Sequence, residues 1–576
     1  MSTLQIRLMR ATGLGVTLML GGTICLLGQD WVKVVTPARF YLRNLVIGLL
    51  EAFLPTYIII VVATIALAVI FLGSIFLTRT RSRLVVARGL LLCGSILLAV
   101  IFAEGVAAVY LFKERHFPAL SHRFTAPVRA ADEILIVVAG ESSALGVPYE
   151  HWLSVGTIIC RELQKAIPSH RFRVEILAEK GATLERMHGK LASLTERPDA
   201  IILFSGHNEF LGRFSLMNRV AYYVDERSGW HGQGWFEHAG RFSPLYTLVR
   251  ENLEKHRVSV MPGQSLGITE TMVGHPICTA DAASMVIEDF HRRLEAIVTE
   301  CEQIGCLPIL IIPPGNDASP PNLSCASPST DAVARQTLAR RLLETLTIEK
   351  QDPNHAITAY RQIIDEQPAH AWAHYRLARL LSSAGLFAEA KQEFILARDQ
   401  DGLPLRSSSR LEAIYERVGH RHPGSILIDG PAVLSSKSRH GILDAELFHD
   451  NVHPNLAGHT ALAEAVLAVL KARAAFGWPV STPAPVLDAQ LCADEFGIDG
   501  AVWATVCERS AAYFAQIACF SSDLANRIEW RDRYATAARQ IRAGARPEDV
   551  GIPGVGVATK NGSRRSAKSA HRSTTN

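Results

Sequence analysis

The sequence lacks the patterns that mark a cofactor or metal site. It has no GxGxxG after a strand, no P-loop and no HExxH, and its ten cysteines form no CxxC pair. Phosphate cradles need closely spaced glycines, and the common zinc sites need paired cysteines or histidines. We therefore expect neither a cofactor nor a metal ion.

A strong charge of either sign is also missing. The formal net charge is +4 over 576 residues, so no long-range field favours nucleic acid as a partner. Among the cysteines, Cys301 lies near Cys306, and Cys492, Cys507 and Cys519 fall within one stretch. Pairing of some of them is open if the domain is exported, and spacing does not give the connectivity.

Long hydrophobic runs, in contrast, are abundant near the N-terminus. Hydrophobic residues make up 48% of the chain, and nearly uncharged runs cover residues 12–28, 56–77 and 89–112. A helix of about 20 apolar residues crosses a bilayer. The sequence therefore predicts a membrane region, residues 1–112, with about three transmembrane helices in the lipid bilayer. A cleaved signal peptide is the alternative for the first and shortest run.

Basic residues predict the orientation of this region. Arg7 and Arg10 precede the first run, and further arginines fill the loop between the second and third runs. Both groups favour the cytoplasm, so the residues after 112 are expected outside it. Glu104, near the middle of the third run, is expected to face protein because a carboxylate in lipid is costly. Basic residues of the first loop oppose this orientation: Lys33, Arg39 and Arg43.

The chain after residue 130 alternates short apolar runs with amphipathic stretches, such as residues 150–166 and 282–304. Near-continuous apolar strands joined by helical crossovers are typical of a parallel sheet with helices on both faces. We therefore predict an α/β domain in two parts, residues 130–330 and 405–475. Its strands are expected at residues 133–140, 173–181, 199–206, 307–315 and 425–430.

An all-α insert is predicted between the two parts, at residues 333–404. Ala356 and Tyr360 recur about one repeat later as Ala390 and Phe394, and Gly385 stands at the turn between two helices. This spacing resembles a tetratricopeptide repeat, a helix pair of about 34 residues that commonly recruits a protein partner. A plain helical hairpin is the alternative.

The C-terminal part is predicted to be a helical appendage, residues 485–555, followed by a tail, residues 556–576. The tail is rich in serine, threonine and basic residues, so we expect it to be disordered. The appendage is expected to pack through five aromatic residues: Trp503, Tyr513, Phe514, Trp530 and Tyr534.

Polar residues follow the ends of several predicted strands and together suit acyl transfer. A serine hydroxyl, Ser142, needs a histidine to take its proton, and His453 needs an acid such as Asp450 to orient it. The oxyanion of the tetrahedral intermediate needs preorganised donors. The backbone N–H groups of Ser142 and Gly181 and the side-chain amide of Asn208 would supply them.

The order of these blocks resembles the SGNH hydrolase superfamily, also called GDSL-type esterases. GESSALG, SGHNEF and DNVHPN are similar to a group of bacterial membrane-anchored members that carry tetratricopeptide repeats. The resemblance implies a flavodoxin-like three-layer α/β/α domain on the periplasmic side of the inner membrane. Three acids depart from the usual pattern without removing a group that the mechanism needs: Glu141, Glu179 and Glu209.

Each candidate residue also has a simpler interpretation. Ser143 is the alternative nucleophile, Asn208 could cap a helix, and His453 could be a structural loop residue. His449, Asp450 and His453 could instead ligate a metal, although no second motif supplies further ligands. His207, His449 and His459 are expected to be structural or to line the substrate site.

We therefore expect an extracytoplasmic serine esterase that cleaves O-acyl or O-acetyl groups from envelope carbohydrate or lipid. One alternative is an O-acyltransferase that passes the acyl group to a hydroxyl of an envelope polymer. Another is a non-catalytic scaffold in which the repeat binds a protein partner. The fold alone does not choose among these, because function depends on the site.

Overall fold

The computed structural model describes residues 57, 60–70, 83–115, 124, 129–211, 243–246, 248–249, 272–274, 280–327, 330–517 and 523–556. The chain divides into two compact units. One comprises residues 1–117 and 212–264, and the other comprises residues 118–211 and 265–576. We describe each unit by itself.

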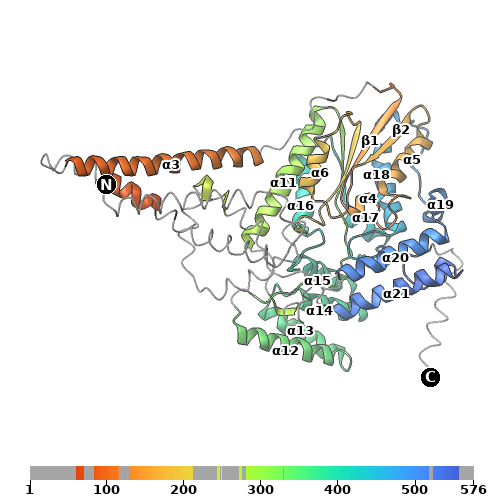
Figure 1. Cartoon of the computed structure of the whole chain (residues 1–576). Coiled ribbons are helices and arrows are strands. Elements are labelled where there is room, and N and C mark those ends of the chain that lie inside the picture. Colours follow the sequence, from red (N-terminus) through yellow and green to blue (C-terminus); the bar gives the residue numbers. More distant parts are fainter. Residues whose placement is uncertain are drawn as a thin grey trace. The chain divides into compact units, whose positions relative to one another are not determined.

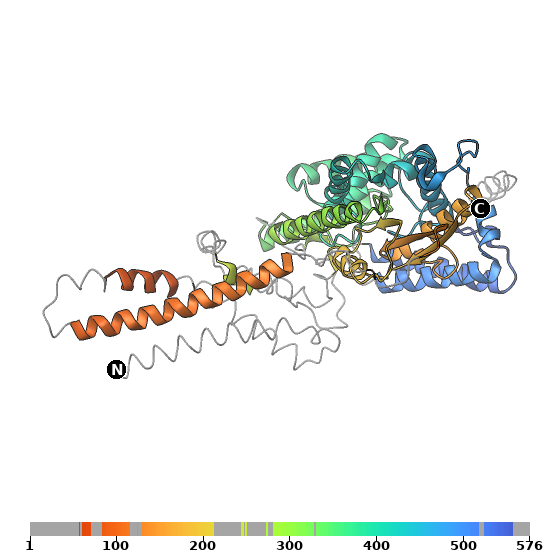
Figure 2. The same ribbon diagram turned by 90° about the horizontal axis from the view of Figure 1, so that it is seen from above.

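The first unit contains a long apolar helix, α3 (Arg83–Arg115). Its segment Ala87–Val109 has a mean hydropathy of 2.3 and is long enough to cross a membrane. Large apolar side chains such as Leu98 and Phe102 are exposed along it, and Figure 2 shows it as one uninterrupted helix. The predicted third run is therefore confirmed as an apolar helix. A shorter apolar helix, Ile60–Ile70, falls in the second run, and the first run lies outside the described residues.

Glu104 of α3 faces protein groups, as the sequence predicts. Its carboxylate accepts hydrogen bonds from the hydroxyl of Tyr57 at 2.5 Å and the hydroxyl of Ser243 at 2.6 Å. The backbone N–H of Leu245 donates a third at 2.9 Å. These donors lower the cost of placing an acid in an apolar helix.

The second unit is built on one parallel sheet of five strands, in the order β2-β1-β3-β4-β5. This is a doubly wound order, in which the winding reverses beside β1 and sites form at the carboxyl ends of the strands. The predicted α/β class is confirmed, although every strand after the first ends earlier than predicted, and the second also begins two residues earlier, at Arg171. Proline at 313 and 314 cannot donate to a ladder, and a helix already begins at Gly430. The strands are β1 (Glu133–Gly140), β2 (Arg171–Ile176), β3 (Ala200–Phe204), β4 (Leu307–Ile311) and β5 (Ile426–Ile428).

Helices cover both faces of the sheet, as Figure 1 shows. Alternate residues of β1 point to opposite faces: Leu135 and Val137 pack in one core, and Ile136 and Val138 in the other. The first core is completed by α6 (Leu184–Leu191), α11 (Ala280–Gln303) and α16 (Ser409–Arg421). The second is completed by α5 (Val155–Ala166), α17 (Gly430–Lys437) and α18 (Leu456–Ala472).

The predicted insert is helical and has its own core. The residues expected to repeat, Ala356, Tyr360, Ala390 and Phe394, are all buried. Gly385 has φ +79° at the turn between two helices, a conformation that side chains other than glycine rarely adopt. The insert consists of α12 (Ala332–Ile348), α13 (Pro353–Glu366), α14 (Ala371–Ser383) and α15 (Phe387–Asp399).

The C-terminal appendage contributes to the second core of the sheet domain. Its helices α20 (Gly500–Ile517) and α21 (Leu524–Arg542) lie side by side in Figure 1, and α19 (Ala489–Glu495) precedes them. Trp503, Phe514 and Tyr534 are buried, and Tyr513 and Trp530 are partly buried against the same core. The predicted disordered tail lies outside the described residues from 557 onward.

The described cysteines are free thiols, and most are buried. Cys301 and Cys306 belong to one hydrophobic core, and their neighbourhood raises the pKa of Cys301 through its contact with Cys306 and through burial. Cys519 lies outside the described residues, so pairing with it stays open. The free thiols are Cys93, Cys160, Cys301, Cys306, Cys325, Cys492 and Cys507.

Candidate active site

The chain turns sharply after β1 and brings Ser142 to the carboxyl edge of the sheet. Gly140 has φ +158°, and a Cβ there would lie 2.1 Å from the carbonyl oxygen of Phe204. The short helix α4 (Ser142–Leu145) begins directly afterwards and ends at Gly146, which has φ +90°. Glycine is therefore required on both sides of this turn. The result leaves Ser142 partly exposed between two buried neighbours.

Ser142, His453 and Asp450 form one hydrogen-bonded chain. Nε2 of His453 lies 2.8 Å from the hydroxyl oxygen of Ser142, and Nδ1 lies 2.7 Å from a carboxylate oxygen of Asp450. An Nδ1–H that donates to the carboxylate leaves Nε2 to accept the serine proton. The structure thus brings these three residues together, although Ser142 and His453 are 311 positions apart in the sequence.

Asp450 is buried but held in its ionised form. Its other carboxylate oxygen, Oδ1, accepts the backbone N–H groups of Val452 at 2.9 Å and His453 at 3.0 Å. Burial alone would raise the pKa of this carboxyl. The charge and hydrogen bond of His453, together with the two N–H donors, outweigh burial and lower the pKa of Asp450. The carboxylate is therefore available to orient the imidazole.

The next residue on this loop, Asn451, is anchored by a buried cation from α21. Its side-chain oxygen accepts hydrogen bonds from the guanidinium of Arg527 and, at 2.7 Å, from the hydroxyl of Ser319. Arg527 is fully buried and also donates to the carbonyl oxygen of Pro320 at 3.1 Å. Sequence analysis missed Arg527, since nothing in its local pattern distinguishes it from a solvated helix residue.

The residue before Asp450 is held by two tyrosines. Nε2 of His449 lies 2.6 Å from the hydroxyl of Tyr149, and Nδ1 lies 3.3 Å from the hydroxyl of Tyr534. Tyr534 also donates to the carbonyl oxygen of His449 at 2.8 Å. Burial lowers the pKa of His449 to about 4, so its ring is neutral near neutral pH. His449 therefore holds this loop in place through its two tyrosine partners, which fits the structural one of the two roles expected from the sequence.

The loop that carries Asn208 is fixed by Glu141, the residue before the serine. One carboxylate oxygen of Glu141 accepts the N–H of Gly206 at 2.9 Å and the N–H of His207 at 2.7 Å. The side-chain nitrogen of Asn208 is buried and has no hydrogen-bond partner among the described residues. A buried amide without a partner costs free energy unless a ligand or water uses it. This amide is therefore available to donate to a bound group.

Gly181 lies on the neighbouring loop. Its φ is +69°, and a Cβ there would come within 3.3 Å of the Leu211 side chain, just after the Asn208 turn. The N–H of Glu179 donates to the carbonyl oxygen of Gly140 at 3.2 Å, which ties this loop to the end of β1. The N–H of Leu184 donates to Glu209 at 3.0 Å. Both predicted donor loops thus meet at the carboxyl end of β1.

The structure also bears on the simpler interpretations. The hydroxyl of Ser143 is buried and donates to the carbonyl oxygen of Val452 at 2.9 Å, whereas His453 pairs with Ser142. Both ring nitrogens of His453 and both of His449 lie within hydrogen-bond distance of protein groups. His207 accepts the N–H of Ser407 at 2.9 Å, and burial lowers its pKa to about 3.

The appendage supplies two more groups beside the site, which sequence analysis assigned only to packing or not at all. The ring of Tyr513 lies 5.1 Å from that of His453 at 81°, an edge-to-face contact. Arg509, one turn earlier on α20, lies 3.2 Å from the carboxylate of Glu150 and 4.9 Å from the ring centre of Trp152. Their distance from Ser142 in sequence gives no local signal of this proximity.

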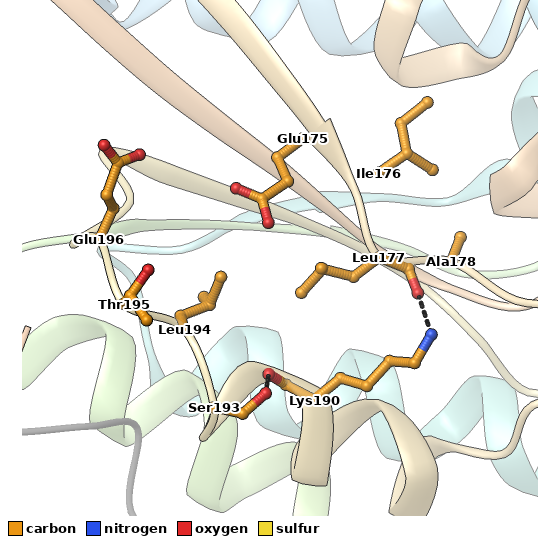
Figure 3. Close-up of a pocket in the computed structure, with 9 residues that line it drawn as sticks. All are labelled: Glu175, Ile176, Leu177, Ala178, Lys190, Ser193, Leu194, Thr195 and Glu196. Atoms are coloured by element: carbon orange, nitrogen blue, oxygen red, sulfur yellow. Dashed lines mark hydrogen bonds between the residues drawn. The ribbon is translucent and has the colours of Figure 1, made fainter. Parts of the chain in front are cut away.

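Some cavities among the described residues are not lined by Ser142. Figure 3 shows one of about 310 Å³ between β2 and the end of α6, where the ammonium of Lys190 donates to the carbonyl oxygen of Leu177 at 3.0 Å. Ser142, Gly181 and Asn208 do not line it, although Leu177 and Ala178 at the start of the Gly181 loop do. Another, of about 360 Å³, borders the loop that carries Asp450 and is lined partly by Asp450, Arg527 and Tyr375 of the insert.

Comparisons with known proteins identify one segment. Residues 347–405 match the tetratricopeptide repeat family, which confirms the predicted repeat in the insert. No curated protein matches the chain. One solved structure that matches is LAE5, an alpha/beta hydrolase enzyme from the metagenome of Lake Arreo, Spain, with 14% identity over 59% of this chain and 95% of that one. The TM-score is 0.24, so no conclusion about function follows from this superposition.

Proposed function

We propose that the protein is a membrane-anchored serine esterase of the SGNH type. The observation that carries this proposal is the chain from Ser142 to His453 at 2.8 Å and from His453 to Asp450 at 2.7 Å. It stands at the carboxyl edge of a parallel sheet, where the loop of Asn208 also ends and keeps a buried amide without a partner among the described residues. A histidine oriented by a carboxylate is what a serine hydroxyl requires to become a nucleophile.

The reaction would proceed through an acyl-enzyme. The hydroxyl oxygen of Ser142 attacks the ester carbonyl while Nε2 of His453 takes its proton, and Asp450 stabilises the imidazolium. The oxyanion would be bound by the N–H groups of Ser142 and Gly181 and by the amide of Asn208. His453 then returns the proton to the departing alcohol. In the second half, water attacks the acyl-enzyme with the same histidine as base and releases the acid.

The proposed substrate is an O-acyl group on carbohydrate or lipid of the bacterial envelope. The apolar helix α3 supports an anchor, and the arginines of the N-terminal region favour a periplasmic site behind a multi-pass membrane region. The tetratricopeptide repeat supports a protein partner, because helix pairs of this kind build extended binding surfaces.

Fluorophosphonate labelling of the purified full-length chain in detergent tests the proposal. Wild type should be labelled, Ser142→Ala should not be, and His453→Ala should be labelled far more slowly. Ser169→Ala is a matched control, because Ser169 is an exposed serine away from the site. A folded wild type without labelling would contradict the active triad, and faster turnover with an added acyl acceptor would indicate a transferase.

A further inference from the structure

Helix α20 reaches from the serine side of the site to the histidine side. Arg509 and Tyr513 are four residues apart, so they share one face of the helix. Arg509 donates to the carbonyl oxygens of Pro148 at 2.7 Å and Glu150 at 3.2 Å, on the loop that follows the Ser142 turn. Tyr513 meets the ring of His453. One helix of the appendage thus contacts the segments that carry both reacting side chains.

The direction of the proposed reaction decides which part of an ester would lie there. A general acid must be within hydrogen-bond reach of the oxygen that it protonates, so the alcohol leaves on the side of His453. The carbonyl oxygen points the other way, toward the donors on the loops of Gly181 and Asn208. A side chain whose ring contacts His453 therefore lies on the side from which the alcohol leaves.

Tyr513 has the chemistry to bind the alcohol portion of an ester. Tyr513 as a whole residue is only partly buried, although it packs against the core. Its hydroxyl is polar, and the Trp152 ring under Arg509 adds a second aromatic surface at the same helix. An aromatic ring with a polar tip suits an alcohol that presents both C–H groups and hydroxyls. A sugar ring presents both C–H groups and hydroxyls, whereas an alkyl chain has no group that forms hydrogen bonds.

We propose that Tyr513 lines the alcohol subsite of the esterase and that this subsite takes a carbohydrate ring. This inference rests on the proposed function and deepens it, because it assigns the substrate's alcohol to a sugar. It also gives the C-terminal appendage a role in substrate choice in addition to its contribution to the core.

Three acetate esters that share one acyl group test the inference: ethyl acetate, hexyl acetate and a monoacetylated methyl pyranoside. In Tyr513→Ala, kcat/KM for the pyranoside ester should fall by about 10- to 100-fold, the range for losing one good pocket contact. The value for ethyl acetate should change by less than about 3-fold, because its alcohol is too small to reach the ring. Tyr513→Phe keeps the ring and should lose less than Tyr513→Ala.

Glu508→Gln is the control on the same helix, since Glu508 is exposed and forms a surface ion pair with Arg542. An equal fall for all three esters would overturn the subsite, because Tyr513 would then act through His453. A fall in kcat/KM for hexyl acetate alone would overturn the carbohydrate class. An unchanged kcat/KM for all three esters would overturn both the subsite role of Tyr513 and the carbohydrate class. Ser142-dependent hydrolysis of ethyl acetate by wild type keeps the proposed function standing in each of these cases. A wild type that hydrolyses none of the esters and takes no label would end both proposals.

Discussion

The two sides of the candidate site differ in how their polar atoms are used. On the histidine side, the loop of residues 449–455 has every buried side-chain nitrogen and oxygen in a hydrogen bond. On the donor side, Asn208 Nδ2, His207 Nε2 and Glu141 Oε2 are buried and unpartnered within the described residues. The hydrogen bonds of the histidine side are therefore all formed without a substrate. The donor side has buried polar atoms that could still form hydrogen bonds with a bound group.

This difference is what differential binding of a transition state requires. An unsatisfied buried polar group costs about 1–3 kcal/mol, so the donor side bears a cost in the free protein. Groups that form hydrogen bonds only when an oxyanion appears raise the rate, whereas groups already satisfied in the ground state hold geometry. We therefore expect substitutions on the donor side to change the rate, and those behind the histidine loop to change stability as well.

The largest effect is expected where the two sides meet. Ser142→Ala should lower kcat for ester hydrolysis by about 10⁴- to 10⁶-fold, and His453→Ala should do the same, because neither residue can act without the other. The double variant should be no slower than either single variant. Steady-state hydrolysis of an acetate ester measures all three, and additive losses would show that the two residues do not act as one unit.

Asn208→Ala isolates the donor side. We expect kcat to fall by about 10²- to 10³-fold with little change in KM, because one oxyanion donor is lost and ground-state contacts stay. Thermal unfolding of the variant should match wild type or exceed it, since the unpartnered amide is gone. A rise in KM with kcat unchanged would instead place Asn208 in ordinary substrate binding.

Arg527→Met isolates the support of the histidine loop. It removes a buried donor from Asn451 and Pro320, so the free energy of unfolding should fall on the order of 3 kcal/mol. Arg533→Met is the control on the same helix: Arg533 is only partly buried, and a loss within about 1 kcal/mol is expected. Thermal unfolding in detergent measures the stability of both variants. Equal losses of stability would show that Arg527 contributes no more to the histidine loop than Arg533 does.

Much of the donor and histidine geometry could be predicted from the sequence because it follows from strand ends. Buried runs such as 133–140 and 199–206 identify strands, and parallel strands bring their carboxyl ends to one edge. Ser142 and Asn208 follow those ends directly, so their meeting depends only on topology. The helical insert could also be predicted, because the spacing of its repeat is a local sequence pattern.

The supporting residues could not be predicted in this way. Arg527 acts on Asn451 across 76 positions, and Tyr534 acts on His449 across 85. Their contacts depend on how the C-terminal helices dock onto the sheet domain, and helical periodicity does not encode that docking. Tyr513 was expected to pack, which it does, but its edge toward His453 follows only from the tertiary arrangement.

His459 is the exception on the histidine side and gives the smallest predicted effect. It is buried on α18 against the ring of Tyr149, and both of its ring nitrogens lack partners within the described residues. Burial lowers the pKa of His459 to about 3. Between about pH 6.5 and this value, the unfolded chain therefore binds a proton on this ring and the folded chain does not. Stability from this group is therefore complete above pH 6.5 and falls as the pH decreases toward 3.

His459→Leu removes the titration and leaves the packing volume nearly unchanged. At pH 5 the wild-type loss from one such histidine is about 2 kcal/mol, so the drop in unfolding free energy between pH 7 and pH 5 should shrink by about that amount in the variant. His355→Leu, at an exposed histidine of the insert, is the matched control for losing an imidazole. Urea unfolding at the two pH values measures the difference. If the decrease in unfolding free energy between pH 7 and pH 5 is the same in His459→Leu as in wild type, the His459 ring takes up a proton in the folded state. Its nitrogens would then be able to form hydrogen bonds, as the unpaired atoms of the donor side can.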